Sequence, residues 1–249
     1  MSTKEKNLSF LGHFSELRRR LIRSVVVLVI TAVLSFIFYD KLFQLLIYPA
    51  PDGIVLQAVK MTEMMGTTMR VALVSGIILA VPYFTYELIM FVSPALTSKE
   101  KKYVYVILPW IALMFAAGVA FAYFILIPRM ISFLMGWGAD LVTVQPMFSD
   151  YINVVTRLLL VSGLVFELPV LTTFLSRLGV LKPQWLASRR KPAIIVAFIL
   201  AAIITPTIDP INQCLVAAPL ILLYELSIWL SKLVYRKKQT AEVSESPIV

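Results

Sequence analysis

The sequence predicts an all-α polytopic membrane protein with six transmembrane helices. Of its 249 residues, 59% are hydrophobic and only 15% are charged, and the mean hydropathy is +0.87. No water-soluble domain of this length needs so much apolar surface. Several apolar runs approach the roughly 20 residues that an α-helix needs to cross the hydrocarbon, and basic segments alternate with segments that contain few cations, which is typical of a chain that crosses repeatedly.

Four apolar runs have the length of ordinary spans, and two are shorter. The expected spans are residues 21–39, 70–92, 103–127, 151–177, 192–206 and 211–231. A helix of about 12 to 15 residues rises only about 18 to 23 Å, so the last two helices are expected to be short and to thin the bilayer locally. The alternative is that flanking residues extend these helices and snorkel to the interface.

Four clusters of cations define one side of the membrane, because short cytoplasmic loops carry excess Lys and Arg. The clusters lie at residues 18–23, 99–102, 189–191 and 236–238, whereas residues 40–70 and 128–150 contain few cations and are expected to be external. For the chain to leave the cytoplasm after Lys191 and return by Arg236, both short stretches must cross, turning at Thr205, Pro206 and Asp209. Both termini are then cytoplasmic, residues 1–238 form one membrane domain, and the polar residues 239–249 are expected to be a disordered tail.

The composition argues against several other classes of protein. The net charge of +9 is explained by the cytoplasmic loops, so no nucleic-acid partner is expected. A single cysteine, Cys214, and a single histidine, His13, give no basis for a metal site. The sequence contains no phosphate-binding loop or hydrolase motif. We therefore expect no cofactor, no metal and no enzymatic activity.

Three glutamates fall inside predicted spans, where an ionised side chain costs at least about 2.5 kcal/mol at the bilayer centre. Glu87 and Glu225 are near the ends of their spans, so snorkelling is the favoured interpretation for both. Glu167 is closest to mid-span and requires an inter-helical, lipid or partner-protein contact. Pro169 follows it and is expected to kink the span at the same level.

Two further acids, Glu16 and Glu100, are embedded in cationic cytoplasmic segments. Glu16 precedes Arg20 by four residues, the spacing of a stabilising helical pair. Glu100 ends the segment Thr97-Ser98-Lys99-Glu100, which fits a capping box at the start of the third span. Spacing alone therefore favours structural roles for both acids.

Several short motifs, in order along the chain, resemble those of the TatC family. His13-Phe14-Ser15-Glu16-Leu17-Arg18-Arg19-Arg20 is similar to its amino-terminal signature H-L-x-E-L-R-x-R, and Phe91-Val92-Ser93-Pro94-Ala95-Leu96 to its first cytoplasmic loop, F-x-x-P-A-L. Phe166-Glu167-Leu168-Pro169 and Thr205-Pro206 with Asp209 also match. The sequence departs from the family pattern at Phe14, where Leu is usual, and at Glu87, where Gln is common.

The resemblance implies a concave six-helix bundle in the bacterial inner membrane. It implies a receptor that binds the twin-arginine signal peptide of folded precursor proteins, and that acts with TatA, TatB and other TatC copies in export driven by the proton-motive force. Two adjacent guanidinium groups call for carboxylates. By resemblance, the signal-peptide site comprises Glu100 as principal acceptor, Glu16 as its companion, Phe91 and Leu96 as packing elements, and Arg18 as part of the signature.

By the same resemblance, Glu167 faces a concave surface where partner helices or lipid dock. A rival interpretation is a proton-coupled small-solute transporter in which Glu87, Glu167 and Glu225 form a relay of carboxylates. Many such transporters have inverted repeats and paired broken helices around a site at the midplane of the membrane. The sequence shows neither feature.

Overall fold

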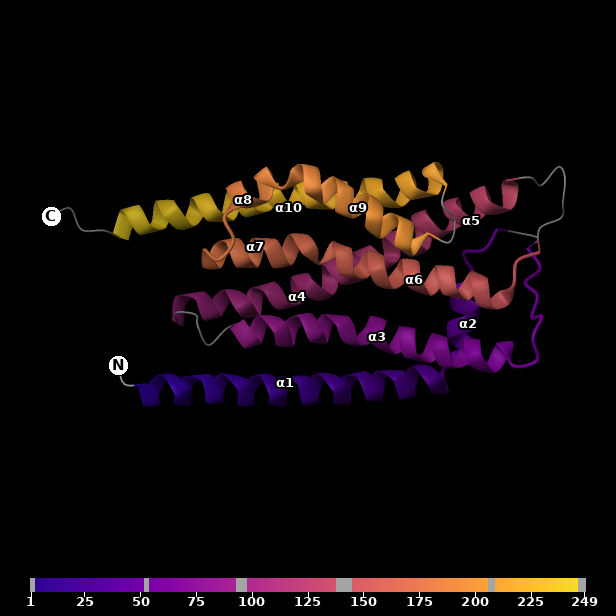
Figure 1. Ribbon diagram of the computed structural model, residues 1–249, viewed down its shortest axis with the longest axis horizontal. Helices are drawn as coiled ribbons and strands as arrows, with labels where there is room; N and C mark the ends of the chain where they lie inside the picture. The colour runs from indigo at the N-terminus through magenta and orange to yellow at the C-terminus, as the bar shows by residue number, and fades with distance from the viewer. Residues whose placement is uncertain (1–2, 52–53, 93–97, 138–144, 206–208, 246–249) are drawn as a thin grey trace.

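The protein is an elongated bundle of helices that run along one axis (Figure 1). The structure, a computed structural model, describes residues 3–51, 54–92, 98–137, 145–205 and 209–245, and side chains for residues 15–51, 54–91, 107–137, 145–205 and 209–235. All regular elements of the described residues are helical, as predicted. Their bounds are α1 Thr3–Ile37, α2 Tyr39–Ile47, α3 Glu63–Val92, α4 Ser98–Phe121, a π-helix Ala122–Leu126, α5 Ile127–Gly136, α6 Phe148–Phe166, α7 Leu168–Leu178, α8 Pro183–Ser188, α9 Arg190–Ile204 and α10 Pro210–Glu245.

Five helical segments of the described chain are long and apolar enough to cross a membrane: Ser15–Ile37, Glu63–Phe91, Ile107–Gly136, Phe148–Leu178 and Pro210–Tyr235. The remaining predicted span corresponds to α9, which has 15 residues and therefore rises about 22 Å. The short fifth helix is thus confirmed, while the count of six crossings and the side on which the termini lie stay predictions.

The last helix corrects two expectations. Its backbone is helical from Pro210 to Glu245 over 36 residues, so α10 is not short, and residues 239–245 are not the disordered segment that their polarity suggested. Extending an existing helix avoids the cost of nucleation, and the segment Lys237-Lys238-Gln239 consists of good helix formers. Polarity alone was therefore a poor guide to where the helix ends.

Two of the long spans are interrupted next to a proline, which has no backbone N–H to donate to the preceding turn. The third span is interrupted by the π-helix Ala122–Leu126 directly before Pro128, as expected where a proline leaves a carbonyl of the preceding turn unpaired. The fourth span divides into α6 and α7 at Glu167, and Pro169 lies in the first turn of α7. The helix is thus interrupted at the level where Pro169 was expected to kink it.

Glycines allow two pairs of helices to approach closely. A Cβ atom on Gly76 of α3 would lie 2.6 Å from Cα of Ala32 in α1, and the Thr31 hydroxyl donates to the Gly76 carbonyl at 2.9 Å. A Cβ atom on Gly118 of α4 would lie 2.6 Å from the Ser162 carbonyl of α6. Small residues at such crossings are typical of membrane helices, whose association depends on close packing.

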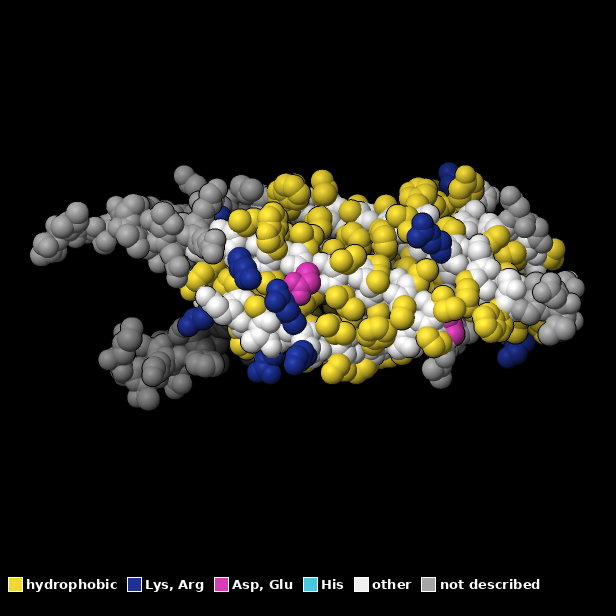
Figure 2. All heavy atoms as spheres, turned by 90° about the horizontal axis from the view of Figure 1, so that it is seen from above, with side chains coloured by type: hydrophobic (Ala, Val, Ile, Leu, Met, Phe, Trp, Pro, Cys, Tyr) yellow, Lys and Arg dark blue, Asp and Glu magenta, His cyan; other side chains and the backbone are white. Residues whose placement is uncertain are grey.

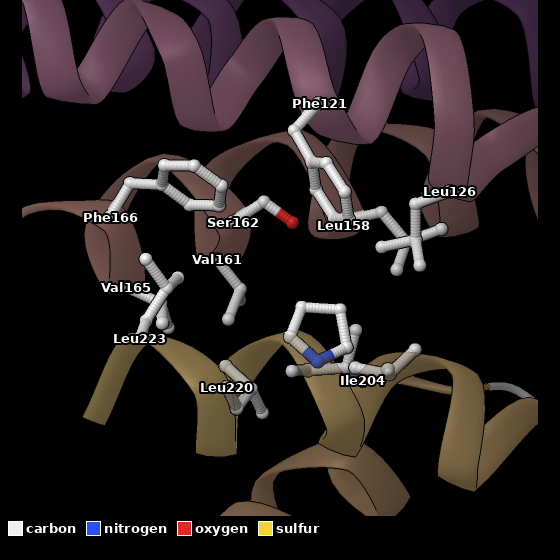
Figure 3. A pocket seen from close by; sticks show the side chains of 12 residues that line it. Phe121, Leu126, Leu158, Val161, Ser162, Val165, Phe166, Ile204, Leu220 and Leu223 are labelled. Atoms are coloured by element: carbon white, nitrogen blue, oxygen red, sulfur yellow. The ribbon is translucent and has the colours of Figure 1, made fainter. Parts of the chain in front are cut away.

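The main core lies among α2, α3, α5, α6, α9 and α10 and is formed by aliphatic and aromatic side chains. Beside it, a void of about 20 Å³ separates α6 from α10. Figure 3 shows this void, with Phe121, Phe166 and Ser162 on one side and Leu220 and Leu223 of α10 on the other. The void is large enough for one water molecule, but its lining is almost entirely apolar, which favours an empty cavity.

The two long segments predicted to be external are joined at the end of the bundle opposite to the termini. Gln57 exchanges backbone hydrogen bonds with the start of α6, its N–H donating to the Pro146 carbonyl at 3.2 Å and its carbonyl accepting from the Phe148 N–H at 2.9 Å. Glu63 accepts from the backbone N–H groups of Val59, at 2.8 Å, and Ser149, at 3.0 Å. The starts of α3 and α6 are thereby held at one level.

Candidate functional site

A network of charged side chains joins α1 to α3 at the end of the bundle that carries the termini. The guanidinium group of Arg20 donates from Nη1 to Glu87 Oε2 at 2.7 Å, from Nη2 to Glu16 Oε1 at 2.6 Å, and from Nε to the same oxygen at 3.1 Å. The Tyr83 hydroxyl donates to Glu87 Oε1 at 2.7 Å. One guanidinium group is therefore held between two carboxylates from different helices.

Helical periodicity and close packing produce this arrangement. Glu16 and Arg20 are four residues apart on α1, and Tyr83 and Glu87 are four residues apart on α3, so each pair lies on one face of its helix. The contact at Gly76 brings these faces together. The helical pair of Glu16 with Arg20 was predicted and is confirmed. Glu87 is only 5% exposed, so the snorkelling interpretation is wrong for this residue.

The structure places some of the predicted signal-peptide residues near this network. Glu16 belongs to it, Arg18 is exposed on α1 nearby, and Phe91 is half-buried one turn beyond Glu87 in α3. Leu96 lies outside the described residues. The backbone of Glu100 is in the first turn of α4, while its side chain, like the proposed capping box that begins at Thr97, also lies outside them.

Glu167 is buried where α6 meets α7. It is 2% exposed, and its Oε2 atom accepts a hydrogen bond from the Thr85 hydroxyl of α3. Its Oε1 atom is buried and has no hydrogen-bond partner. Of the contacts that the sequence left open for Glu167, the structure thus contains an inter-helical one.

Glu225 lies at a different interface, between α9 and α10. It forms a two-point ion pair with Arg190, with Nε 2.8 Å from Oε1 and Nη2 donating to Oε2 at 3.0 Å. The two side chains are 49% and 46% exposed, consistent with a position near the interface. Glu87, Glu167 and Glu225 therefore have three separate sets of partners, and nothing in the described structure links them into the relay that a transporter would need.

The predicted turn between the last two spans is built partly from helix-capping contacts. The Asp209 carboxylate accepts from the Asn212 N–H at 2.7 Å, which makes it the N-cap of α10, with Pro210 in the first helical position. The Thr205 hydroxyl donates to the Ala201 carbonyl at 2.9 Å and closes the end of α9. Pro206 lies outside the described residues. The roles visible for Thr205 and Asp209 are structural.

The charges on the surface are distributed unevenly along the bundle. Figure 2 shows the face over α8, α9 and α10, where hydrophobic side chains predominate along the bundle and most of the Lys and Arg side chains gather toward the end with the termini, beside an acidic side chain. Among the described residues, no group of three His, Cys, Asp or Glu side chains is arranged to hold a metal ion. The cations of this face thus gather at the same end of the bundle as the Arg20 network (Figure 2).

Comparison with known proteins identifies this arrangement. The family model of the Sec-independent protein translocase protein (TatC) matches residues 12–219, a range that includes the Arg20 network with Glu87, and Glu167, and that ends before Glu225. The chain belongs to the TatC family. Its members are components of the Sec-independent, or twin-arginine, protein translocase, which is a transport role, and the helical architecture agrees with a membrane protein.

Relatives of the TatC family match nearly the whole chain. The Sec-independent protein translocase protein TatC of Desulforapulum autotrophicum is 36% identical over 246 residues, covering 97% of this chain and 91% of the relative. That of Aquifex aeolicus is 38% identical over 235 residues, covering 91% and 96%. A crystal structure described as the twin arginine translocase receptor TatC superposes with a TM-score of 0.81 at 36% identity, covering 89% of this chain and 99% of the other. The predicted TatC-like fold is confirmed.

Sequence reasoning missed Arg157, a charged residue well inside a predicted span. Arg157 lies in α6, exposed, and donates from Nη1 to the Ile203 carbonyl of α9 at 3.2 Å. An arginine inside an apolar run was the signal that should have drawn attention to it, because such residues normally have a partner or a function.

Proposed function

We propose that this TatC-family chain is the receptor subunit that binds the twin-arginine signal peptide of folded precursors, at the basic end of the bundle. With TatA, TatB and further copies of TatC, it supports export across the bacterial inner membrane driven by the proton-motive force. On the loop-charge prediction, this end and both termini are cytoplasmic. Partner helices or lipid are proposed to dock near Glu167.

The observation that carries the proposal is the site around Arg20. Glu16 and Glu87 hold one guanidinium group through three N–H donors, at 2.6 to 3.1 Å. Carboxylates in this geometry recognise arginine, whose planar fork of donors lysine cannot reproduce. The side chain of Glu16 is 31% exposed, so solvent and a peptide can reach it from outside the helix pair.

The position of α4 supports a second acceptor at the same end. α3 ends at Val92 and α4 begins at Ser98, and Figure 1 shows these helix ends side by side at the end of the bundle with the termini. The backbone of Glu100 is in the first turn of α4, and we propose that its carboxylate contributes to the same binding surface. A pair of acids on two helices matches the need of two neighbouring guanidinium groups. Glu100 is proposed as the principal acceptor because Glu16 already binds Arg20.

The test is photocrosslinking of a signal peptide to membranes that contain the protein with its partners. A photoreactive residue at position 91 reports contact, and the peptide is used with a twin-arginine or a twin-lysine motif. Glu100→Gln is expected to reduce crosslinking to the level of the twin-lysine peptide, and Glu16→Gln to reduce it less. Glu225→Gln is the matched control, since it removes an exposed, ion-paired carboxylate from a different interface.

The level of protein in the membrane and its protease pattern show whether each variant is folded. Crosslinking that is equal for Glu100→Gln, for Glu225→Gln and for the unaltered chain would exclude Glu100 as the acceptor. Equal crosslinking by the twin-arginine and twin-lysine peptides would exclude recognition of guanidinium groups altogether.

A further inference from the structure

A hollow with two arginines lies between α3 and α6, at the end of the bundle opposite to the signal-peptide surface. It has a volume of about 400 Å³ and is lined by Arg70, Val74, Asn153, Thr156, Arg157 and Leu160. Arg70 donates to the Asn153 side-chain carbonyl, and Arg157 to the Ile203 carbonyl. Each guanidinium group thus uses one of its five donors, and among the described carboxylates none forms an ion pair with either.

The two arginines lie at nearly the same depth. Glu63 and Ser149 hold the starts of α3 and α6 together at 3.0 Å. At roughly 1.5 Å per residue, Arg70 lies about 10 Å along α3 from Glu63, and Arg157 about 14 Å along α6 from its first residue. Long arginine side chains easily span the difference. The guanidinium groups of Arg70 and Arg157 therefore lie at about the same depth in the surrounding bilayer.

This level corresponds to the boundary between the hydrocarbon and the headgroups. α3 has 30 residues and is about 45 Å long, so it exceeds a hydrocarbon core of about 30 Å by about 7 Å at each end. Arg70 is then only about 3 Å inside a bilayer of ordinary thickness.

Next to the hollow, the bilayer is expected to be thinner still. Figure 1 shows α9 ending part-way along α6, with the start of α10 also short of the outer ends of α3 and α6. The bond from Arg157 to Ile203 places the end of α9 at the level of the arginines. A bilayer that adapts to the short helix brings its headgroups down to this level.

The hollow has the polarity of a phospholipid. Its outer part carries the two guanidinium groups, and one turn further into the membrane lie the half-buried side chains of Val74 and Leu160. Guanidinium groups bind phosphate oxygens through paired donors, and basic pockets between membrane helices bind lipid headgroups. The neighbouring hollow shares Arg70 and Asn153 and is also lined by Lys60, Glu63 and the exposed Asp150.

We propose that Arg70 and Arg157 bind the phosphate group of a phospholipid from the leaflet at this end of the bundle, with an acyl chain along Val74 and Leu160. On the loop-charge prediction this is the external leaflet. The bound lipid supplies the anion that two arginines at this depth otherwise lack, and holds the bilayer at the level of the short helix α9. The site is separate from the proposed signal-peptide surface and does not depend on it.

Native mass spectrometry of the purified protein tests the proposal. The protein is released from micelles that contain phosphatidylglycerol, phosphatidylcholine or inorganic phosphate without lipid. One retained phospholipid is expected, more strongly for the anionic phosphatidylglycerol, and inorganic phosphate at equal concentration should not displace it. Arg70→Gln and Arg157→Gln should each lower the retained fraction about tenfold, the effect of losing one charge-assisted contact. Arg129→Gln, which alters an exposed arginine of α5 outside the hollow, should leave it unchanged.

Folding is checked by thermal unfolding in the same micelles. Should Arg157→Gln fail to fold because α9 loses its contact, Arg70→Gln decides the test, together with Arg70→Lys, which keeps the charge and should restore part of the binding. Equal lipid retention by folded Arg70→Gln and by the unaltered protein would overturn the site. Displacement of the lipid by inorganic phosphate would overturn the lipid as its ligand.

Discussion

The buried ion pair between Arg20 and Glu87 gives the sharpest prediction for stability, because its two partners are not equivalent. Replacing Arg20 by Leu leaves the Glu87 carboxylate, which is 5% exposed, with only the Tyr83 hydroxyl. An uncompensated buried charge of this kind costs about 3–5 kcal/mol. Replacing Glu87 by Leu leaves Arg20 bound to Glu16 at 2.6 Å, so the loss is limited to one charge-assisted hydrogen bond, about 1.5–3 kcal/mol.

The double variant Arg20→Leu with Glu87→Leu distinguishes this reasoning from simple loss of packing. Removing both charges leaves no unpaired buried group, and such replacements are often close to neutral. The double variant should therefore be more stable than Arg20→Leu alone, and the two effects should be strongly non-additive. The free energy of unfolding is measured by titration with a denaturing detergent in mixed micelles, followed by tryptophan fluorescence.

The exposed pair of Arg190 and Glu225 is the matched control. Its side chains are 49% and 46% exposed, so each substitution to Leu should cost at most about 1 kcal/mol. Equal costs for Arg20→Leu and Glu87→Leu that add in the double variant would refute the asymmetric, buried pair.

Three further substitutions test the packing and capping of the helices. Gly76→Ala should weaken the contact between α1 and α3, because its Cβ atom would lie 2.6 Å from backbone, whereas Gly66→Ala meets nothing within 4 Å; disulfide crosslinking between cysteines placed on the two helices measures the difference. Asp209→Ala should lower the unfolding free energy by about 0.5–2 kcal/mol through loss of the N-cap, and Asp209→Asn by less, measured by thermal unfolding. Gly179→Ala should cost about 1 kcal/mol in the same assay, because Gly179 ends α7 at φ 81°, and an unchanged midpoint would contradict this.

The sequence predicted contacts correctly where the interacting residues lie close together along the chain. The bond between Glu16 and Arg20 follows from a separation of four residues, and the break at Glu167 follows from Pro169, since both depend on one helix only. The partner of Glu87 was not predictable in this way. Its contact with Arg20 spans 67 residues and exists because Gly76 lets two helices approach, so the sequence suggested snorkelling instead.

The spacing of residues in the sequence also could not predict that Arg70 and Arg157 lie at the same depth in the membrane. Arg157 and Arg70 belong to different spans, and only the joined ends of α3 and α6 and the end of α9 bring them to one level. The end of α10 was misjudged for a related reason: polarity predicts exposure to water, but a helix that is already formed extends through good helix formers whether or not they are buried.

Hydropathy and loop charge by themselves determined that this protein is a helical membrane protein, with a basic end and a short fifth helix, because crossing hydrocarbon imposes the length and the composition of each span. The ordered motifs indicated the TatC family. The tertiary structure alone decided which charges are paired, which carboxylates are buried and that two arginines line one hollow, because those properties depend on contacts between helices that are distant in sequence.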